Sequence, residues 1–131
     1  MDFDRTGIIL YVLHYQECVH FYKDILALPV LFETRTLICF SFGGSYLMVE
    51  IDDEYEGDKQ YSKRLSTCLR MNVANVKILA QHLMAKNISV DYQEHPWGTV
   101  AKFFDPDGNL CSFKDSKKFE IQVNEYKDKL K

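Results

Sequence analysis

Cysteine and histidine are the residues of this sequence with the greatest capacity for nucleophilic and metal chemistry, and both are scattered along the chain. The dispersed residues are Cys18, Cys39, Cys68, Cys111, His14, His20, His82 and His95. No CxxC pair or Cys/His cluster offers metal ligands at short, regular spacings. The chain also lacks a Gly-x-Ser-x-Gly motif and a phosphate-cradling glycine loop. We therefore predict mostly buried, structural cysteines and surface histidines.

A second chemical feature is a run of carboxylates in the middle of the chain. Six acidic residues fall within nine positions: Glu50, Asp52, Asp53, Glu54, Glu56 and Asp58. Such a run usually forms a solvated loop. The alternative is an electrostatic funnel that attracts a cationic ligand. The sequence leaves both interpretations open.

The composition of the 131 residues fits one self-sufficient domain. Apolar residues make up 47% and charged residues 27%, which is enough for a core without disulfides or a structural metal. The net charge of -3 provides no basic surface for nucleic acid. No apolar stretch of about 18 residues indicates a membrane span, and the first residues lack signal-peptide features. We therefore expect a cytoplasmic protein with reduced thiols and no nucleic-acid or membrane partner.

Apolar periodicity predicts two similar halves that would position these residues. The first half reads as strands at 7–15, 30–33, 36–42 and 46–51 with a helix at 16–27. The second reads as strands at 66–73, 88–93, 98–104 and 109–114 with a helix at 75–86. Val12 recurs as Val73 and Val30 as Val90 at nearly the same offset, which indicates an internal duplication. A C-terminal helix is expected at about 116–131, outside the repeat.

Two local strings, VHFYKDIL at 19–26 and DPDGNL at 105–110, stand on this duplicated frame. In this order they resemble the vicinal-oxygen-chelate superfamily, which includes glyoxalases, extradiol dioxygenases, fosfomycin-resistance enzymes and bleomycin-resistance proteins. The first string is similar to the family's first helix, and the second to its most recognisable turn. PWG at 96–98, YLMVE at 46–50 and TCLRM at 67–71 are similar to the bleomycin-resistance branch. The resemblance covers nearly the whole chain up to Asp115. It implies one α+β domain over 1–131, in which two tandem βαβββ modules, at about 7–51 and 66–115, form a cupped mixed sheet.

The resemblance also implies where a metal would bind, because the family's enzymes hold a divalent ion through one residue from each of four strands. Those positions fall on Gly7, Glu50, Cys68 and Ser112. Only Glu50 is a credible ligand for a hard cation, and a stable site needs three or four donors. We therefore predict no metal and no other cofactor, and an enzyme that uses the metal as a Lewis acid is disfavoured.

The resemblance and strand alternation give the candidate binding residues. If the former metal positions face the cup, residues two apart on the same strands share that face. The predicted ligand-binding residues are Tyr11, Phe40, Tyr46, Met48, Glu50, Cys68, Arg70, Trp97 and Ser112. Trp97 either stacks on a planar ligand or caps the last hairpin. For Tyr11, Tyr46 and Met48 the alternative is core packing, which is slightly favoured. For Glu50 the alternative is an ion pair with Arg70. The sequence does not decide to which face of the sheet Phe40 points.

Two classes of function follow from the resemblance. The first is a metal-free binding protein of the bleomycin-resistance type, which sequesters a planar aromatic compound in the cleft of a homodimer, as in antibiotic resistance. In one interpretation this compound is cationic. The second is a metal-dependent glyoxalase-like lyase or extradiol-type dioxygenase with an altered ligand set. A small dimeric regulator or carrier is a third possibility.

Overall fold

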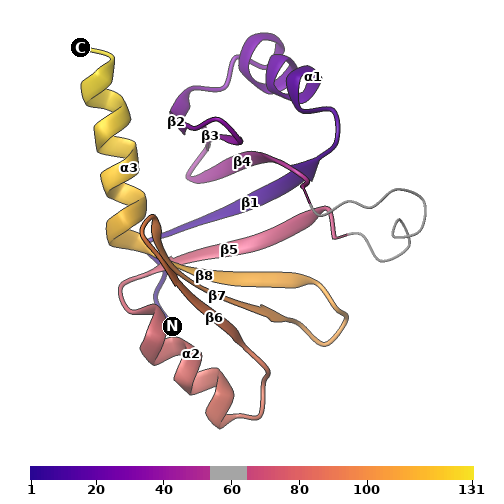
Figure 1. The fold of residues 1–131 in the computed structure, drawn as a ribbon, viewed down its shortest axis with the longest axis vertical. Coiled ribbons are helices and arrows are strands. Elements are labelled where there is room, and N and C mark those ends of the chain that lie inside the picture. The colour runs from indigo at the N-terminus through magenta and orange to yellow at the C-terminus, as the bar shows by residue number, and fades with distance from the viewer. Residues whose placement is uncertain (54–64) are drawn as a thin grey trace.

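The chain folds around one mixed β-sheet, seen in a computed structural model that describes residues 1–53 and 65–131 (Figure 1). The described residues form eight strands in the order β2-β3-β4-β1-β5-β8-β7-β6. The first module contributes β1 (Arg5–Val12), β2 (Val30–Glu33), β3 (Leu37–Phe42) and β4 (Ser45–Ile51). The second contributes β5 (Thr67–Val73), β6 (Asp91–His95), β7 (Gly98–Phe104) and β8 (Leu110–Asp115).

The two modules have the same internal pairing. The first strand of each lies parallel to the last, β1 beside β4 and β5 beside β8. The modules join where β1 and β5 pair antiparallel, with Gly7 opposite Arg70 and Ile9 opposite Cys68. The predicted fold class, two tandem modules in a cupped mixed sheet followed by a C-terminal helix, is confirmed. Because side chains alternate along a strand, this register brings residues of both modules onto one face.

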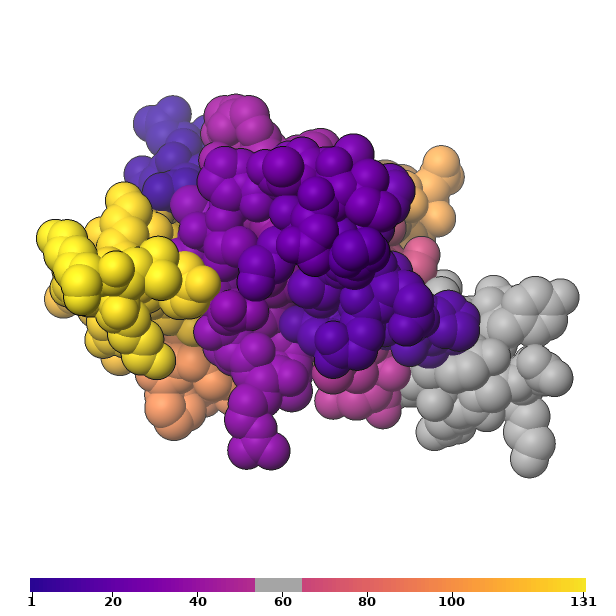
Figure 2. Space-filling model, turned by 90° about the horizontal axis from the view of Figure 1, so that it is seen from above, coloured from indigo at the N-terminus to yellow at the C-terminus, as the bar shows by residue number. Residues whose placement is uncertain are grey.

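The helices cover the two faces of the sheet differently. On one face, α1 (Tyr15–His20) and the π-helical turn η1 (Phe21–Ile25) pack over β3 and β4, and α2 (Val76–Ala85) packs over β7 and β8. On the other face lies α3 (Ser116–Lys129), whose Phe119 and Val123 join the core cluster of Ile9 and Met48. Figure 1 shows α3 rising from the end of β8 beside β2, and Figure 2 shows its surface against the first module.

Local chemistry explains where the observed elements depart from the predicted ranges. The first helix changes from α to π hydrogen bonding at Phe21 and ends before Ala27, whose φ is 55°. The strand expected at 88–93 begins later, at Asp91, because the Ile88 N–H bonds to the Leu83 carbonyl and completes the end of α2. Both longer helices begin at a side-chain cap, Asn75 for α2 and Asp115 for α3.

The cysteines agree with one further expectation. Cys39, Cys68 and Cys111 are buried free thiols, and Cys18 is partly buried. Within the described ranges, 1–53 and 65–131, no helix has the length and apolarity needed to cross a membrane. Of the acidic run, Glu54, Glu56 and Asp58 lie outside the described residues.

Candidate functional site

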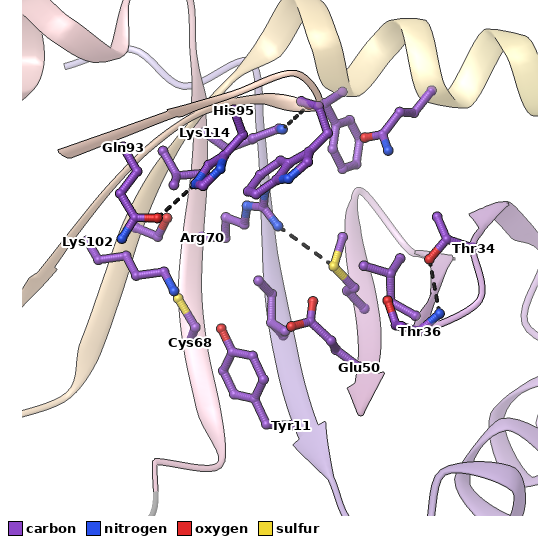
Figure 3. Close-up of a pocket in the computed structure, with 18 of the residues that line it drawn as sticks. Tyr11, Thr34, Thr36, Glu50, Cys68, Arg70, Gln93, His95, Lys102 and Lys114 are labelled. Atoms are coloured by element: carbon purple, nitrogen blue, oxygen red, sulfur yellow. Dashed lines mark hydrogen bonds between the residues drawn. The ribbon is translucent and has the colours of Figure 1, made fainter. Parts of the chain in front are cut away.

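The concave face of the sheet encloses a cavity of about 600 Å³ beneath α3. That volume suits a small organic ligand. Residues of both modules line it, together with Phe119 and Gln122 of α3. Figure 3 shows Arg70 in the middle of this cup, with Lys114 on one side of it and Glu50 and Tyr11 on the other. Residues of one chain therefore line the cup.

Most of the predicted ligand-binding residues line the cup. Those that do are Tyr11, Met48, Glu50, Cys68, Arg70, Trp97 and Ser112. Among the described residues no ion pair joins Glu50 to Arg70, whose Nη1 instead lies 3.7 Å from the Met48 Sδ. The ion pair with Arg70, which was the alternative interpretation of Glu50, is therefore not formed.

The prediction is corrected for Tyr46 and Phe40, because both are completely buried and neither lines the cavity. The Tyr46 hydroxyl donates a 2.6 Å hydrogen bond to the Asn72 Oδ1, and its ring lies 4.6 Å from that of Phe119. Phe40 points to the opposite face of the sheet, where its ring lies 6.3 Å from that of Tyr22. Tyr46 is thus on the predicted face but under α3, and Phe40 is on the other face.

The position of the first metal ligand in the resembled enzymes is filled by a neighbouring side chain. Gly7 on β1 lies opposite Tyr46 on β4. A Cβ atom added to Gly7 would overlap the Tyr46 ring. No side chain larger than hydrogen therefore fits at residue 7 unless this buried ring moves.

The other three metal positions provide one carboxylate and two poor donors. Burial raises the pKa of the Cys68 thiol to about 11, so the thiolate that binds metals is scarce at neutral pH. The Ser112 hydroxyl donates to the Phe113 carbonyl at 3.2 Å. In the described part of the chain, no group of three or more His, Cys, Asp or Glu side chains could hold a metal ion. With Glu50 as the remaining donor, these residues do not fit the family's divalent metal.

Basic side chains occupy the floor of the cup instead. Arg70 on β5 lies opposite Ser112 on β8, which lies opposite Lys102 on β7. Lys114 follows two residues after Ser112 on the same face. Arg70 is 8% exposed and Lys114 is 1% exposed. The sequence analysis overlooked Lys102 and Lys114, although alternation from Ser112 would have placed Lys114 beside it.

Trp97 forms a side wall of the cup at the turn between β6 and β7. Its ring stacks on that of His95, with centroids 4.4 Å apart and planes 7° apart. The Lys114 Nζ donates to the Trp97 carbonyl at 2.8 Å and lies 4.5 Å from the centre of the indole ring. About half of the Trp97 side chain stays exposed. Trp97 therefore holds the buried lysine in place through its carbonyl, and its indole ring forms part of the cavity lining.

The environment of Lys114 favours its neutral form. Burial lowers the pKa of Lys114 from 10.5 to about 8, and the positive charges of Arg70 and Lys118 act in the same direction, whereas Asp115 raises it. Between about pH 8 and 10.5 the unfolded chain keeps a proton that the folded protein has released. Stability from this group therefore rises with pH over that window.

We expect the free energy of unfolding of the wild type to gain about 2 kcal/mol relative to that of Lys114→Met as the pH is raised from 8 to 10. The variant is needed as a reference because buried thiols act in the opposite direction: the pKa of Cys39 is raised to about 12 and that of Cys68 to about 11. Urea unfolding across this pH range measures the difference. A difference that stays constant would show that Lys114 has an ordinary pKa.

The comparisons with known proteins agree with this architecture. A model of the glyoxalase-like domain family matches residues 6–118. No curated protein gave a significant match. A solved structure from Legionella pneumophila, described as an NAD-dependent benzaldehyde dehydrogenase, has a TM-score of 0.69 at 20% identity, covering 84% of this chain and 97% of that chain.

Two other solved structures are similar at comparable identity. A glyoxalase/bleomycin resistance protein/dioxygenase superfamily member from Vibrio splendidus has a TM-score of 0.63 at 18% identity, covering 86% of this chain and 98% of its own. Methylmalonyl-CoA epimerase from Mycobacterium tuberculosis has a TM-score of 0.59 at 16% identity, covering 86% of both chains. At these identities the structures share the fold, and the family match over most of the sequence gives the assignment: this chain belongs to the glyoxalase-like domain family.

Proposed function

We propose that this protein binds a small planar organic molecule in the cup, as bleomycin-resistance proteins do, without a resident metal. The observation that carries the proposal is the Tyr46 ring, which covers Gly7 at the position of the first metal ligand. Without that ligand the cup offers side-chain contacts for binding rather than a Lewis acid. A metal-dependent lyase or dioxygenase would need donors that Gly7, Cys68 and Ser112 do not supply.

Trp97 supports a planar ligand. Its ring lines the cavity and is about half exposed, so a flat molecule entering the cup can pack against the exposed part of the indole. Glu50 and Asp53 also line the cavity, and they support a cationic group on the ligand near that end. A homodimer remains part of the proposal, although the cup itself lies within one chain.

The first test uses Trp97, the single tryptophan of the sequence, as a fluorescent reporter. We expect bleomycin or another planar aromatic compound to quench it saturably, and Trp97→Ala to weaken binding about 30-fold by calorimetry. Protein purified without an affinity tag is expected to contain no stoichiometric divalent metal.

Phe42→Ala is the control for the tryptophan substitution, because Phe42 is an exposed aromatic residue in β3 that does not contribute to the cup lining. It should leave the affinity unchanged. Loss of folding in Trp97→Ala, measured by circular dichroism, would instead make Trp97 a hairpin cap. One equivalent of bound metal, lost together with a measurable activity, would contradict the proposed function.

A further inference from the structure

The floor of the cup holds three basic side chains that form no ion pair with a carboxylate of the described residues, although the charge of Asp115 acts on Lys114. Arg70 and Lys114 are almost completely buried, and Lys102 is partly buried. No ion pair within residues 1–53 and 65–131 includes any of them. By contrast, Arg5 at the edge of the sheet has an ordinary counter-ion, with its Nε 2.7 Å from the Glu120 Oε2.

Arg70 has the least satisfied environment of the three. Within residues 1–53 and 65–131, its Nη1 donates a hydrogen bond to the thioether sulfur of Met48, which is a weak acceptor. Its Nε is buried and has no hydrogen-bond partner among the described residues. A buried cation without a partner is costly, so such a group is expected to meet an anion during function.

The register places these groups where one anion can reach several of them. Arg70, Ser112 and Lys102 lie side by side on three adjacent strands, and Lys114 is next along β8. The guanidinium fork of an arginine matches a carboxylate or phosphate in two parallel hydrogen bonds. Lys114 also links this floor to the Trp97 wall through its hydrogen bond to the Trp97 carbonyl.

We propose that the floor of the cup is an anion-binding subsite, in which Arg70 receives the acidic group of a planar ligand whose ring lies against Trp97. Lys102 and Lys114 add positive charge around the same group, and Ser112 lies on β8 between Arg70 on β5 and Lys102 on β7. The ligand class is therefore an aromatic acid, with a carboxylate, sulfonate or phosphate. This inference rests on the proposed function, since it assigns an end of the ligand that stacks on Trp97.

The first experiment needs no ligand. Arg70→Met keeps an unbranched side chain of similar reach and removes the unpaired buried charge, so the variant should melt about 4 °C or more above the wild type. Arg5→Met is the matched control and should melt at or below the wild-type temperature, because it removes an arginine that has a partner. A lower melting temperature for Arg70→Met would make Arg70 a structural residue and overturn the inference.

The second experiment compares 2-naphthoate with 2-naphthamide, which share a ring and differ in charge. Calorimetry should show the acid binding to the wild type at least ten-fold more tightly than the amide. Arg70→Met should bring the affinity for the acid down to that for the amide, which abolishes this preference. Lys102→Met, at a partly exposed position, should reduce the preference in a variant that folds normally.

The outcomes separate this inference from the proposed function. Equal affinities of the wild type for the acid and the amide would overturn the anion subsite and leave planar binding at Trp97 standing. Failure of both probes to bind would count against the proposed function and the inference together.

Discussion

Replacing Phe119 with alanine is expected to lower the free energy of unfolding by about 3–5 kcal/mol. The Phe119 side chain is fully buried where α3 crosses the cup. Its ring lies 4.6 Å from that of Tyr46 and 5.4 Å from that of Phe32, and the Arg5 guanidinium lies 5.7 Å from its centre. Truncation would leave a cavity between the helix and the sheet, because these rings come from separate strands and cannot all collapse into it.

Ile121→Ala is the control for the truncation of Phe119. Ile121 is on the same helix but is 39% exposed, so its truncation should cost less than about 1 kcal/mol. Urea unfolding followed by circular dichroism gives both values. Because Phe119 also lines the cavity, ligand affinity should fall with the stability of α3. Equal losses of unfolding free energy in the two variants would show that the buried face of α3 contributes no more to stability than its partly exposed face.

The sequence was sufficient to predict the architecture because the same signals occur twice. Both halves contain an apolar strand, an amphipathic helix and a glycine-containing hairpin, and the duplicated order leaves few ways to pair the strands. Pairing of β1 with β5 then brings Ile9 beside Cys68 and places both modules around one cup. The residues of the cup floor follow from alternation along these strands.

The corrections concern side chains whose positions depend on tertiary packing. Alternation places Tyr46 on the cup face, but α3, which lies outside the repeat, covers it through Phe119. The face of Phe40 depends on the register of β3 against β4, which pairs Phe40 with Leu47. The position of Lys114 against Trp97 depends on the turn between β6 and β7, which approaches it only in the folded sheet.

The charged residues that the sequence makes conspicuous are not the ones that form the floor of the cup. The acidic run is continuous in sequence and therefore conspicuous, whereas Arg70, Lys102 and Lys114 are far apart along the chain. Strand pairing assembles them on the floor of the cup. Glu50 and Asp53 line the same cavity, so one ligand with both an acidic and a basic group could use both ends.

Introducing histidine at Gly7 is expected to lower the free energy of unfolding by about 3 kcal/mol or more. The first added atom would already overlap the Tyr46 ring. That ring cannot move without loss, because it is fully buried, packs on Phe119 and is fixed by its hydroxyl group's hydrogen bond to Asn72. Gly44→Ala in the β3–β4 hairpin is the control, since a Cβ there meets no atom within 4 Å.

A double-mutant cycle tests whether Tyr46 is the cause of this loss. Tyr46→Ala is itself destabilising, because it opens a cavity, but it removes the atoms that an added side chain at Gly7 would meet. Gly7→His should therefore cost less in the Tyr46→Ala background, with a coupling of about 2 kcal/mol. Additive losses would mean that Tyr46 does not exclude a side chain from residue 7. A stable Gly7→His protein that takes up one equivalent of zinc would show that the Tyr46 ring does not block the first position of the family's metal site.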